Sequence, residues 1–295
     1  MDKKKPAEGK RATKKRTGRG RFNATPEQSP PSLQSMESLL AGFSGMGRGG
    51  RSAVDEAQQI MYDAWDAPTP QRALALARKA LEVSPDCADA YNLLAEETAK
   101  SLEELIELYR KGVEAGERAL GKKAFKEDVG YFWGLIETRP YMRARAGLAQ
   151  GLWEAGRGEE AVEHYRDLLR LNPNDNQGIR DLLMPCLIVL GHDGEAEKLF
   201  KRYQEDGMAV WRYSRVLLDF RESGNSPIAI ESLQAALDEN KHVPSYLLGR
   251  KKMPRSLPGH YGFGDDNEAV LYVHGSWVAW KSTPGAMEWL AAKVR

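Results

Sequence analysis

Six side chains in the middle of the chain could recognise a partner that carries carboxylates, and three of them are arginines. A guanidinium group binds a carboxylate through two parallel hydrogen bonds, so several arginines in one groove would favour an acidic peptide, such as a C-terminus. An indole beside them would add an aromatic contact surface. The predicted partner-binding residues are Arg143, Gln150, Trp153, Gln177, Arg180 and Arg212.

The same arginines have acidic neighbours, which offer a structural alternative. Glu137, Asp175 and Asp181 are near enough in sequence to pair with them and to hold successive structural units in register. Because a bidentate ion pair can form within one chain as well as between chains, the sequence leaves both interpretations open.

Other reactive residue types do not form catalytic patterns. The histidines at 164, 192, 242, 260 and 274 lack the close spacing of a zinc site, and His164 is expected to be solvated. Cys87 and Cys186 are expected to be small core residues. No Gly-x-Ser-x-Gly elbow and no lysine-bearing phosphate loop occurs. We therefore predict no catalytic residue, no metal site, no cofactor and no enzymatic activity.

A glycine motif near the N-terminus resembles a dinucleotide-binding loop only in its spacing. Gly45, Gly47 and Gly50 match Gly-x-Gly-x-x-Gly, and Asp66 lies at roughly the distance of the expected acidic residue. That fold also needs a buried strand before the motif and strand–helix alternation after it, and neither is present. Residues 43–51 are therefore interpreted as a flexible hinge.

The charges of the 295 residues are unevenly distributed. The net charge is +1, but residues 1–51 hold 12 Lys/Arg against 4 Asp/Glu, and ten of these basic residues lie within 3–21. This tail has few large apolar residues, so it is expected to be disordered, although residues 32–41 could form a short helix. A basic tail can bind nucleic acid by releasing counterions, or it can be a solubilising or targeting extension, which we prefer here.

The sequence predicts a cytoplasmic protein. No apolar run reaches the roughly 18–20 residues of a membrane span, and no apolar segment of a secretory signal follows the basic N-terminus. Two cysteines cannot form a disulfide framework, which favours a reducing interior. We expect no membrane partner, and the oligomeric state is not determined.

From about residue 53 the sequence is typical of an all-α protein. Apolar residues recur at three- and four-residue spacing. Thr69-Pro70, Ser226-Pro227 and Thr283-Pro284 each offer an N-cap followed by a proline in the first helical position. Residues 269–280 are the best strand candidate, but their helical spacing predicts a helix. Ten to twelve helices are expected.

Residues 142–173 have the pattern of a helix–turn–helix unit. Gly156 can end the first helix, Ala161 lets two helices approach closely, and Asn172-Pro173 ends the second helix. The pattern resembles the tetratricopeptide repeat, a 34-residue antiparallel helix pair, although Arg145 stands at its tryptophan-like position. Less regular copies occur on both sides of this unit.

About five units give a helical-repeat domain at residues 52–295, after a tail and hinge at 1–51. Residues 121–140 are an expected insertion between the second and third units, and residues from about 266 to 295 an expected C-terminal cap. Such pairs stack into an α-solenoid whose first helices line a concave face. In that arrangement the six predicted partner-binding residues share one groove.

A second resemblance covers residues from about 130 to 290. The segments GYFWGLIETRPYMRARAGLA, NPNDNQGIRDLL, HVPSYLLGRKKMP and GAMEWL are similar to bacterial relatives of the suppression-of-tumorigenicity-7 family. The resemblance implies a helical-repeat fold and a binding role, and the membrane-spanning helices of the animal members have no counterpart in the sequence. We therefore expect a non-enzymatic scaffold that binds a protein segment in its groove. The alternative is a nucleic-acid-associated adaptor anchored by the basic tail.

Overall fold

The computed structural model describes Glu37, residues 52–203 and residues 206–294. Over this part of the chain it contains thirteen α-helices, two short 3-10 helices and no β-strand, which confirms the predicted all-α fold. Glu37 apart, the predictions for residues 1–51, including the hinge and the short helix, lie outside the described residues. None of the helices described is both long enough and apolar enough to cross a bilayer.

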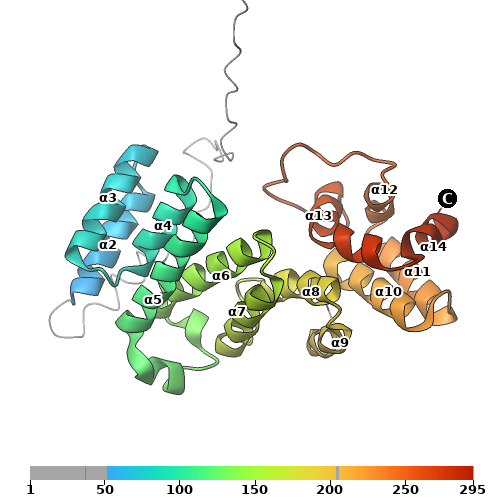
Figure 1. Cartoon of the computed structure of the whole chain (residues 1–295), viewed down its shortest axis with the longest axis horizontal. Helices are drawn as coiled ribbons and strands as arrows, with labels where there is room; N and C mark the ends of the chain where they lie inside the picture. The colour runs from blue at the N-terminus through green and yellow to red at the C-terminus, as the bar shows by residue number, and fades with distance from the viewer. Residues whose placement is uncertain (1–36, 38–51, 204–205, 295) are drawn as a thin grey trace, which may run out of the picture.

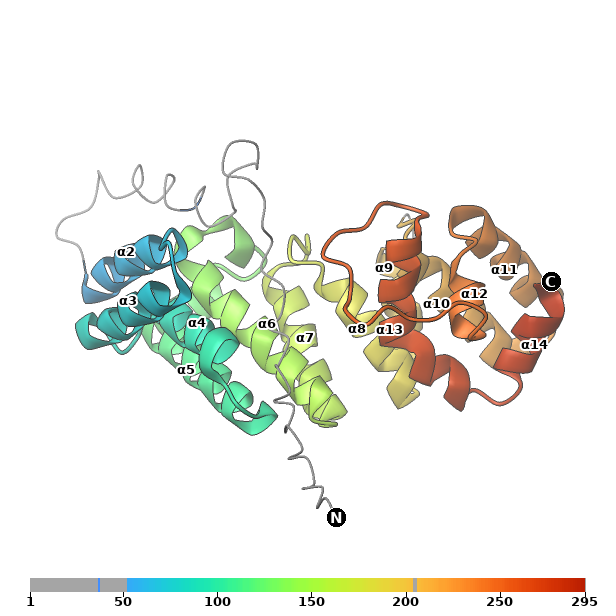
Figure 2. The same ribbon diagram turned by 90° about the horizontal axis from the view of Figure 1, so that it is seen from above.

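Ten of the helices form five antiparallel pairs that stack along the molecule (Figures 1 and 2). The first helices of neighbouring pairs touch each other at α2–α4, α4–α6 and α8–α10. This is the tetratricopeptide-like solenoid that the sequence predicts. The pairs are α2 (Ala53–Trp65) with α3 (Pro70–Val83), α4 (Ala88–Thr98) with α5 (Leu102–Glu127), α6 (Arg139–Glu154) with α7 (Gly158–Leu171), α8 (Ile179–Leu190) with α9 (Asp193–Arg202), and α10 (Ala209–Ser223) with α11 (Pro227–Glu239).

The residues predicted to end the helices of the third pair and to let them pack closely act as predicted. Gly156 has φ 77° directly after α6, where a glycine adopts the left-handed conformation at little cost. The Arg157 amide donates to the Leu152 carbonyl at 2.9 Å and closes the turn. Ala161 is fully buried in α7, and the helix ends at Leu171, before Asn172-Pro173.

Two of the three predicted proline starts are correct. The side chains of Thr69 and Ser226 accept hydrogen bonds from backbone amides at the beginnings of α3 and α11. The third start is wrong, because α14 (Ala286–Lys293) begins after Gly285, beyond Thr283-Pro284. Gly285 has φ 77°, so the chain turns there before it becomes helical.

The predicted insertion separates α5 from α6 and fixes where α6 begins. α5 is interrupted at Gly121, whose φ of 68° and ψ of 166° are not helical. The 3-10 helices η2 (Phe132–Gly134) and η3 (Ile136–Thr138) then lead directly into α6. Phe132 is fully buried, with its ring 5.2 Å from that of Phe125 and 6.2 Å from that of Tyr141. Phe132 therefore anchors the insertion in the core between α5 and α6, whereas Tyr131 beside it is 73% exposed.

The C-terminal helices lie against the fourth and fifth pairs. They are α12 (Val243–Leu247), α13 (Asp266–Ser282) and α14, and α13 confirms the helix predicted at 269–280. α13 packs against α8 and α10, the first helices of those pairs. The chain itself therefore covers the helices that were expected to line the C-terminal half of the groove (Figure 1).

Candidate functional site

Two arginines project from the first half of α6. Arg139 and Arg143 are four residues apart, so they lie on one face of the helix. Thr138, directly before α6, donates its hydroxyl to the carbonyl of Leu135 at 2.8 Å and to that of Phe132. Arg139 Nε donates to the Trp133 carbonyl at 2.9 Å, and its guanidinium lies 5.3 Å from the centre of the indole. The insertion therefore holds Arg139 in place.

Arg143 is anchored to a buried carboxylate on α4. Its Nε and Nη2 donate to Asp89 Oδ1 and Oδ2 at 2.9 and 2.6 Å. Asp89 is 1% exposed and also accepts from Gln58 Nε2 on α2 at 2.9 Å and from Asn92 Nδ2 at 3.1 Å. This aspartate therefore ties together the first helices of three successive pairs.

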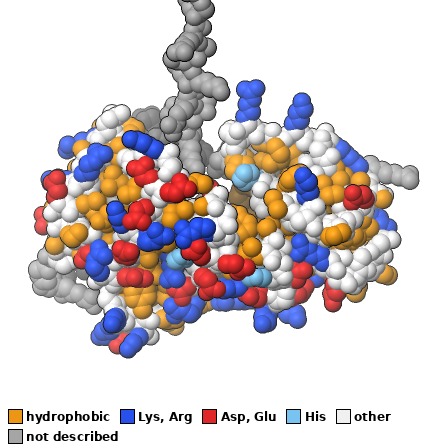
Figure 3. Space-filling view, in the orientation of Figure 1, with side chains coloured by type: hydrophobic (Ala, Val, Ile, Leu, Met, Phe, Trp, Pro, Cys, Tyr) orange, Lys and Arg blue, Asp and Glu red, His pale blue; other side chains and the backbone are white. Residues whose placement is uncertain are grey.

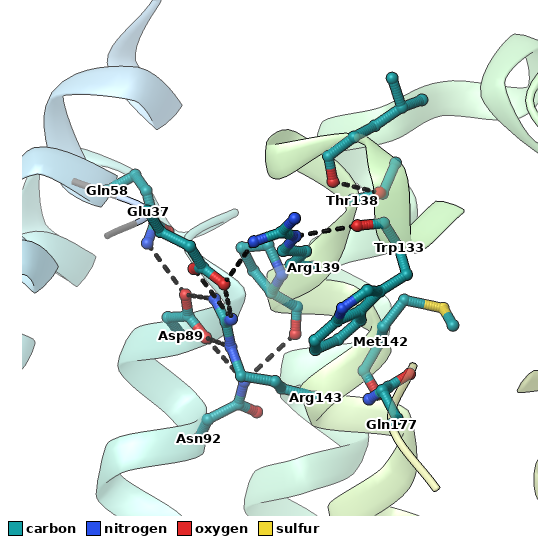
Figure 4. Close-up of polar contacts among 12 residues, drawn as sticks. Glu37, Gln58, Asp89, Asn92, Trp133, Thr138, Arg139, Met142, Arg143 and Gln177 are labelled. Carbon is teal, nitrogen blue, oxygen red and sulfur yellow. Dashed lines mark hydrogen bonds and ion pairs between the residues drawn. The ribbon is translucent and has the colours of Figure 1, made fainter. Parts of the chain in front are cut away.

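A second carboxylate, that of Glu37, lies across both arginines (Figure 4). Arg139 Nη1 donates to Glu37 Oε1 at 3.0 Å, and Arg143 Nη1 donates to Oε1 and Oε2 at 3.1 and 3.0 Å. The Glu37 side chain is 2% exposed, whereas those of Arg139 and Arg143 are 17% and 21% exposed. Two arginines and two carboxylates make the cluster neutral, and without Glu37 it would carry one unbalanced positive charge.

Burial and the charges of this cluster together shift the pKa values of Arg143 and of Tyr62. Burial disfavours the charged guanidinium of Arg143, but the carboxylates of Asp89 and Glu37 outweigh burial and raise its pKa above the usual value. Burial, followed by the same two carboxylates, raises the pKa of Tyr62 to about 12. Arg143 is therefore permanently charged and is suited to holding a carboxylate.

Arg180 belongs to a different ion-pair network. Its guanidinium donates to Asp206 Oδ2 at 2.8 and 3.3 Å and to Asp175 Oδ2 at 3.2 Å, and Asp181 lies 3.8 Å away. Asp181 also accepts from Trp211 Nε1 at 2.8 Å, and burial raises its pKa to about 6. Arg180 thus pairs with both aspartates named in the structural alternative.

The other predicted site residues do not form a single cluster with Arg143 and Arg180. Arg212 pairs with Glu239 at 3.7 Å, and Gln177 Nε2 lies 3.5 Å from the Met142 carbonyl. Gln150 is exposed and donates to Glu154 on the same helix at 3.2 Å, and Trp153 is half-buried against the core. Within the described part of the chain, the ion pairs of Arg143, Arg180 and Arg212 have no residue in common.

The histidine and cysteine predictions have different outcomes. The expectation that His164 is solvated is wrong, because the ring is half-buried and burial, followed by Arg145, lowers its pKa to about 4. Cys87 and Cys186 are buried free thiols, as predicted, and burial raises both pKa values to about 12. Within the described ranges, no three His, Cys, Asp or Glu side chains are placed to hold a metal ion.

Arg143 is among the partner-binding residues predicted from the sequence, but the residues that complete its cluster, Arg139, Asp89 and Glu37, are not. The four-residue spacing of Arg139 and Arg143 is visible in the sequence and could have identified the pair. Asp89 and Glu37 are 54 and 106 residues from Arg143, and no local pattern indicates which acidic residue reaches it.

Comparisons with known proteins match most of this chain to one protein family. The family model described as "ST7 protein" matches residues 49–294. "Protein ST7 homolog" from Caenorhabditis elegans is 29% identical over 275 residues, which cover 79% of this chain and 50% of that protein. "Suppressor of tumorigenicity 7 protein-like" from Gallus gallus is 28% identical over 260 residues, which cover 81% of this chain and 47% of that protein. The chain thus spans about half the length of the curated relatives it matches.

One solved structure is similar at a lower level. The crystal structure of YrrB, described as a TPR protein with an unusual peptide-binding site, is 20% identical to this chain with a TM-score of 0.46. The matched region makes up 66% of this chain and 90% of the YrrB chain.

Proposed function

This chain belongs to the ST7 protein family, and we propose that it is a non-enzymatic interaction scaffold that binds an acidic protein segment on the concave side of its helix pairs. The contacts of Glu37 support this proposal most directly. Two arginines on α6 hold a carboxylate that comes from more than 100 residues away in the sequence. A partner carboxylate in the same place would find the same three hydrogen bonds.

Glu37 would then be an occupant that a partner has to displace. The exchange of one carboxylate for another leaves the cluster neutral, so it requires no new buried charge. Asp89 remains paired with Arg143 throughout, because its two hydrogen bonds use other atoms of the guanidinium group. The site is therefore preorganised for its ligand before the ligand arrives.

We assign different roles to the six predicted partner-binding residues. Arg143 would contact the partner's carboxylate, and the exposed Gln150 lies two helical turns further along α6 on the same face. Arg180 is paired with buried carboxylates of the chain, so we assign it to the stability of the fold, and Arg212, 3.7 Å from the half-exposed Glu239, would stay accessible to the partner. Trp153 and Gln177 would form the surroundings of the groove.

The proposal is tested with the full chain and a peptide of its own sequence. The probe is a fluorescein-labelled peptide of residues 32–41, SLQSMESLLA, and binding is followed by fluorescence anisotropy. Glu37 is part of the same chain and competes with the probe at an effective concentration on the order of 1 mM. If the Glu37 segment and the probe both bind with a Kd of about 0.1 mM, removal of this competitor by Glu37→Gln should strengthen binding of the probe about tenfold.

Two controls make this result specific. A peptide with glutamine in place of Glu37 should bind poorly, and the chain with both Glu37→Gln and Arg139→Gln should lose the gain. If the glutamine peptide binds as tightly as the glutamate peptide, or if Glu37→Gln leaves the affinity unchanged, the carboxylate site is not the partner site.

The alternative function, association with nucleic acid, is supported by a different observation. Ten basic residues lie within residues 3–21, a density that favours binding to phosphate.

As part of the main proposal we also place the protein in the cytoplasm. Its two buried free thiols are compatible with a reducing compartment.

A further inference from the structure

Exposed apolar side chains are concentrated in one part of the C-terminal half. Six of the ten large hydrophobic residues that are exposed in the described chain lie within residues 253–278, on α13 and on the segment before it. In Figure 3, hydrophobic and basic side chains lie side by side over the upper right of the molecule, where Figure 1 places α12, α13 and their connection. Such patches mark interaction sites. The six residues are Met253, Leu257, Tyr261, Phe263, Trp277 and Val278.

A hollow of about 630 Å³ opens within this patch. Tyr246 of α12 and Val273 of α13 are buried beneath it, and Leu257 and Trp277 line it with 46% and 40% of their surfaces exposed. A hollow with an apolar lining and an indole at its edge can accept an apolar side chain from a partner.

The charged side chains that line the hollow are all positive. Lys251, Lys252 and Arg255 are among its lining residues, and no Asp or Glu is. Lys251 is paired with Asp266 at 2.5 Å, whereas Lys252 and Arg255 have no ion pair or hydrogen bond with any described residue. The sequence from residue 241 to 264 contains no acidic residue. The hollow therefore combines an apolar lining with two cations that lack a counter-charge in the part of the chain that the structure describes.

We propose that this surface, which we call the α12–α13 hollow, docks an acidic protein segment. An apolar side chain of the partner would lie against Trp277, and a neighbouring carboxylate would pair with Lys252 and Arg255. Charge complementarity selects an acidic partner, because only anions balance these two cations. The concave shape favours a peptide over a lipid bilayer, since a hollow of this volume receives side chains and a flat surface does not fill it.

This docking site goes beyond the function proposed above and does not depend on it. The Arg139–Arg143 cluster lies among α2, α4 and α6, and the α12–α13 hollow lies on the other half of the molecule (Figures 1 and 2). The first recognises a carboxylate alone, whereas the second also requires an apolar side chain.

The test is a selection of random peptides displayed on phage against the full chain. We expect enriched sequences to place Asp or Glu within two positions of Leu, Ile, Met or Phe. A fluorescein-labelled synthetic copy of the most enriched sequence then serves as the probe. Its affinity should fall at least tenfold for the double variant Lys252→Glu/Arg255→Glu, and by a similar factor for Trp277→Ala.

Matched variants separate this result from general charge effects and from the first site. Lys122→Glu/Lys123→Glu reverses two lysines at the end of α5 and should leave the affinity unchanged, as should Glu37→Gln. Lys252→Gln/Arg255→Gln provides a milder variant if the reversal impairs folding, which circular dichroism would reveal.

Three results would overturn the proposal. One is enrichment of peptides without acidic residues, and another is equal affinity of the probe for Lys252→Glu/Arg255→Glu and the unchanged chain. The third is binding of vesicles of phosphatidylcholine and phosphatidylserine through Lys252 and Arg255 with no peptide enriched, since the surface would then recognise lipid.

Discussion

Replacing Arg180 by methionine tests whether the arginines of the groove support the fold or are free to bind a partner. Methionine keeps an apolar side chain beside Tyr203, whose ring centre lies 5.2 Å from the guanidinium carbon, but it removes the charge. Asp175, whose side chain is fully buried, would lose the charged partner of one of its oxygens. Asp206, with a side chain that is 12% exposed, would lose two hydrogen bonds.

The expected loss of stability follows from these contacts. A hydrogen bond to a charged group contributes about 1.5–3 kcal/mol, and breaking one side of a buried ion pair costs about 3–5 kcal/mol. The Arg180 side chain is 24% exposed, so water screens part of the interaction. Asp175 also keeps the amide hydrogen bonds from Ile179 and from residue 180, at 2.7 and 3.0 Å. We therefore expect a loss of about 2–3 kcal/mol, equivalent to a Tm lower by about 5–10 °C.

The measurement is thermal unfolding at pH 7 followed by circular dichroism, with a matched variant as control. Arg157→Met removes an exposed ion pair, in which the side chains of Arg157 and Glu160 are 42% and 55% exposed. This change should alter the free energy of unfolding by less than about 0.5 kcal/mol. A Tm for Arg180→Met within 1 °C of the unchanged chain would refute the structural assignment. The Arg180 guanidinium would then be available for a partner, as the groove hypothesis requires.

Three further predictions concern packing, protonation and the tail. Gly147→Ala should lower stability by about 1–3 kcal/mol in urea unfolding, because a Cβ there would lie 2.3 Å from the ring of Tyr109, whereas Gly194→Ala, with open space around it, should not lower it. His164 should titrate near pH 4 in NMR rather than near 6.5. Because the unfolded chain then binds the proton at a higher pH than the folded chain, stability should fall as pH drops from about 6.5 to about 4. A titration midpoint near 6.5 would show that the ring is solvated. Deleting residues 2–21 should abolish any retention on immobilised nucleic acid, whereas retention that survives the deletion would exclude the tail as the anchor.

The fold was predictable because its signals are local. Glycines that end helices, small residues that allow close packing and Asn-Pro stops each act within one helix pair, and Gly156 and Ala161 behave as their residue types suggest. The start of α14 was not predictable from Thr283-Pro284, because Gly285 follows at once and its left-handed conformation delays the helix. Local signals also could not show that α13 would pack on α8 and α10, since that contact joins distant parts of the chain.

The candidate site was predicted only in part, because ion pairs are decided by the fold. Arg143 was identified from its position in a repeat, but its partners come from α4 and from residue 37. His164 was misjudged for a related reason. It lies on the polar side of its own helix, yet neighbouring elements bury the ring. The sequence of one helix does not show which of its polar side chains a neighbouring element covers.

The way each cation is neutralised separates structural basic residues from those available to a partner. Arg180 pairs with carboxylates whose side chains are buried or nearly so, so a ligand would have to break these ion pairs to reach it, whereas the Arg212–Glu239 pair is longer, at 3.7 Å, and half-exposed. Arg139 pairs with Glu37 alone, a carboxylate that another could replace. Lys252 and Arg255 have no partner within the described chain and stand beside exposed apolar side chains. Substitution of Lys252 and Arg255 should therefore weaken the binding of an acidic partner strongly. Substitution of Arg139 should weaken it only where the Glu37 carboxylate has been displaced or removed. Substitution of Arg180 should weaken it only by destabilising the fold.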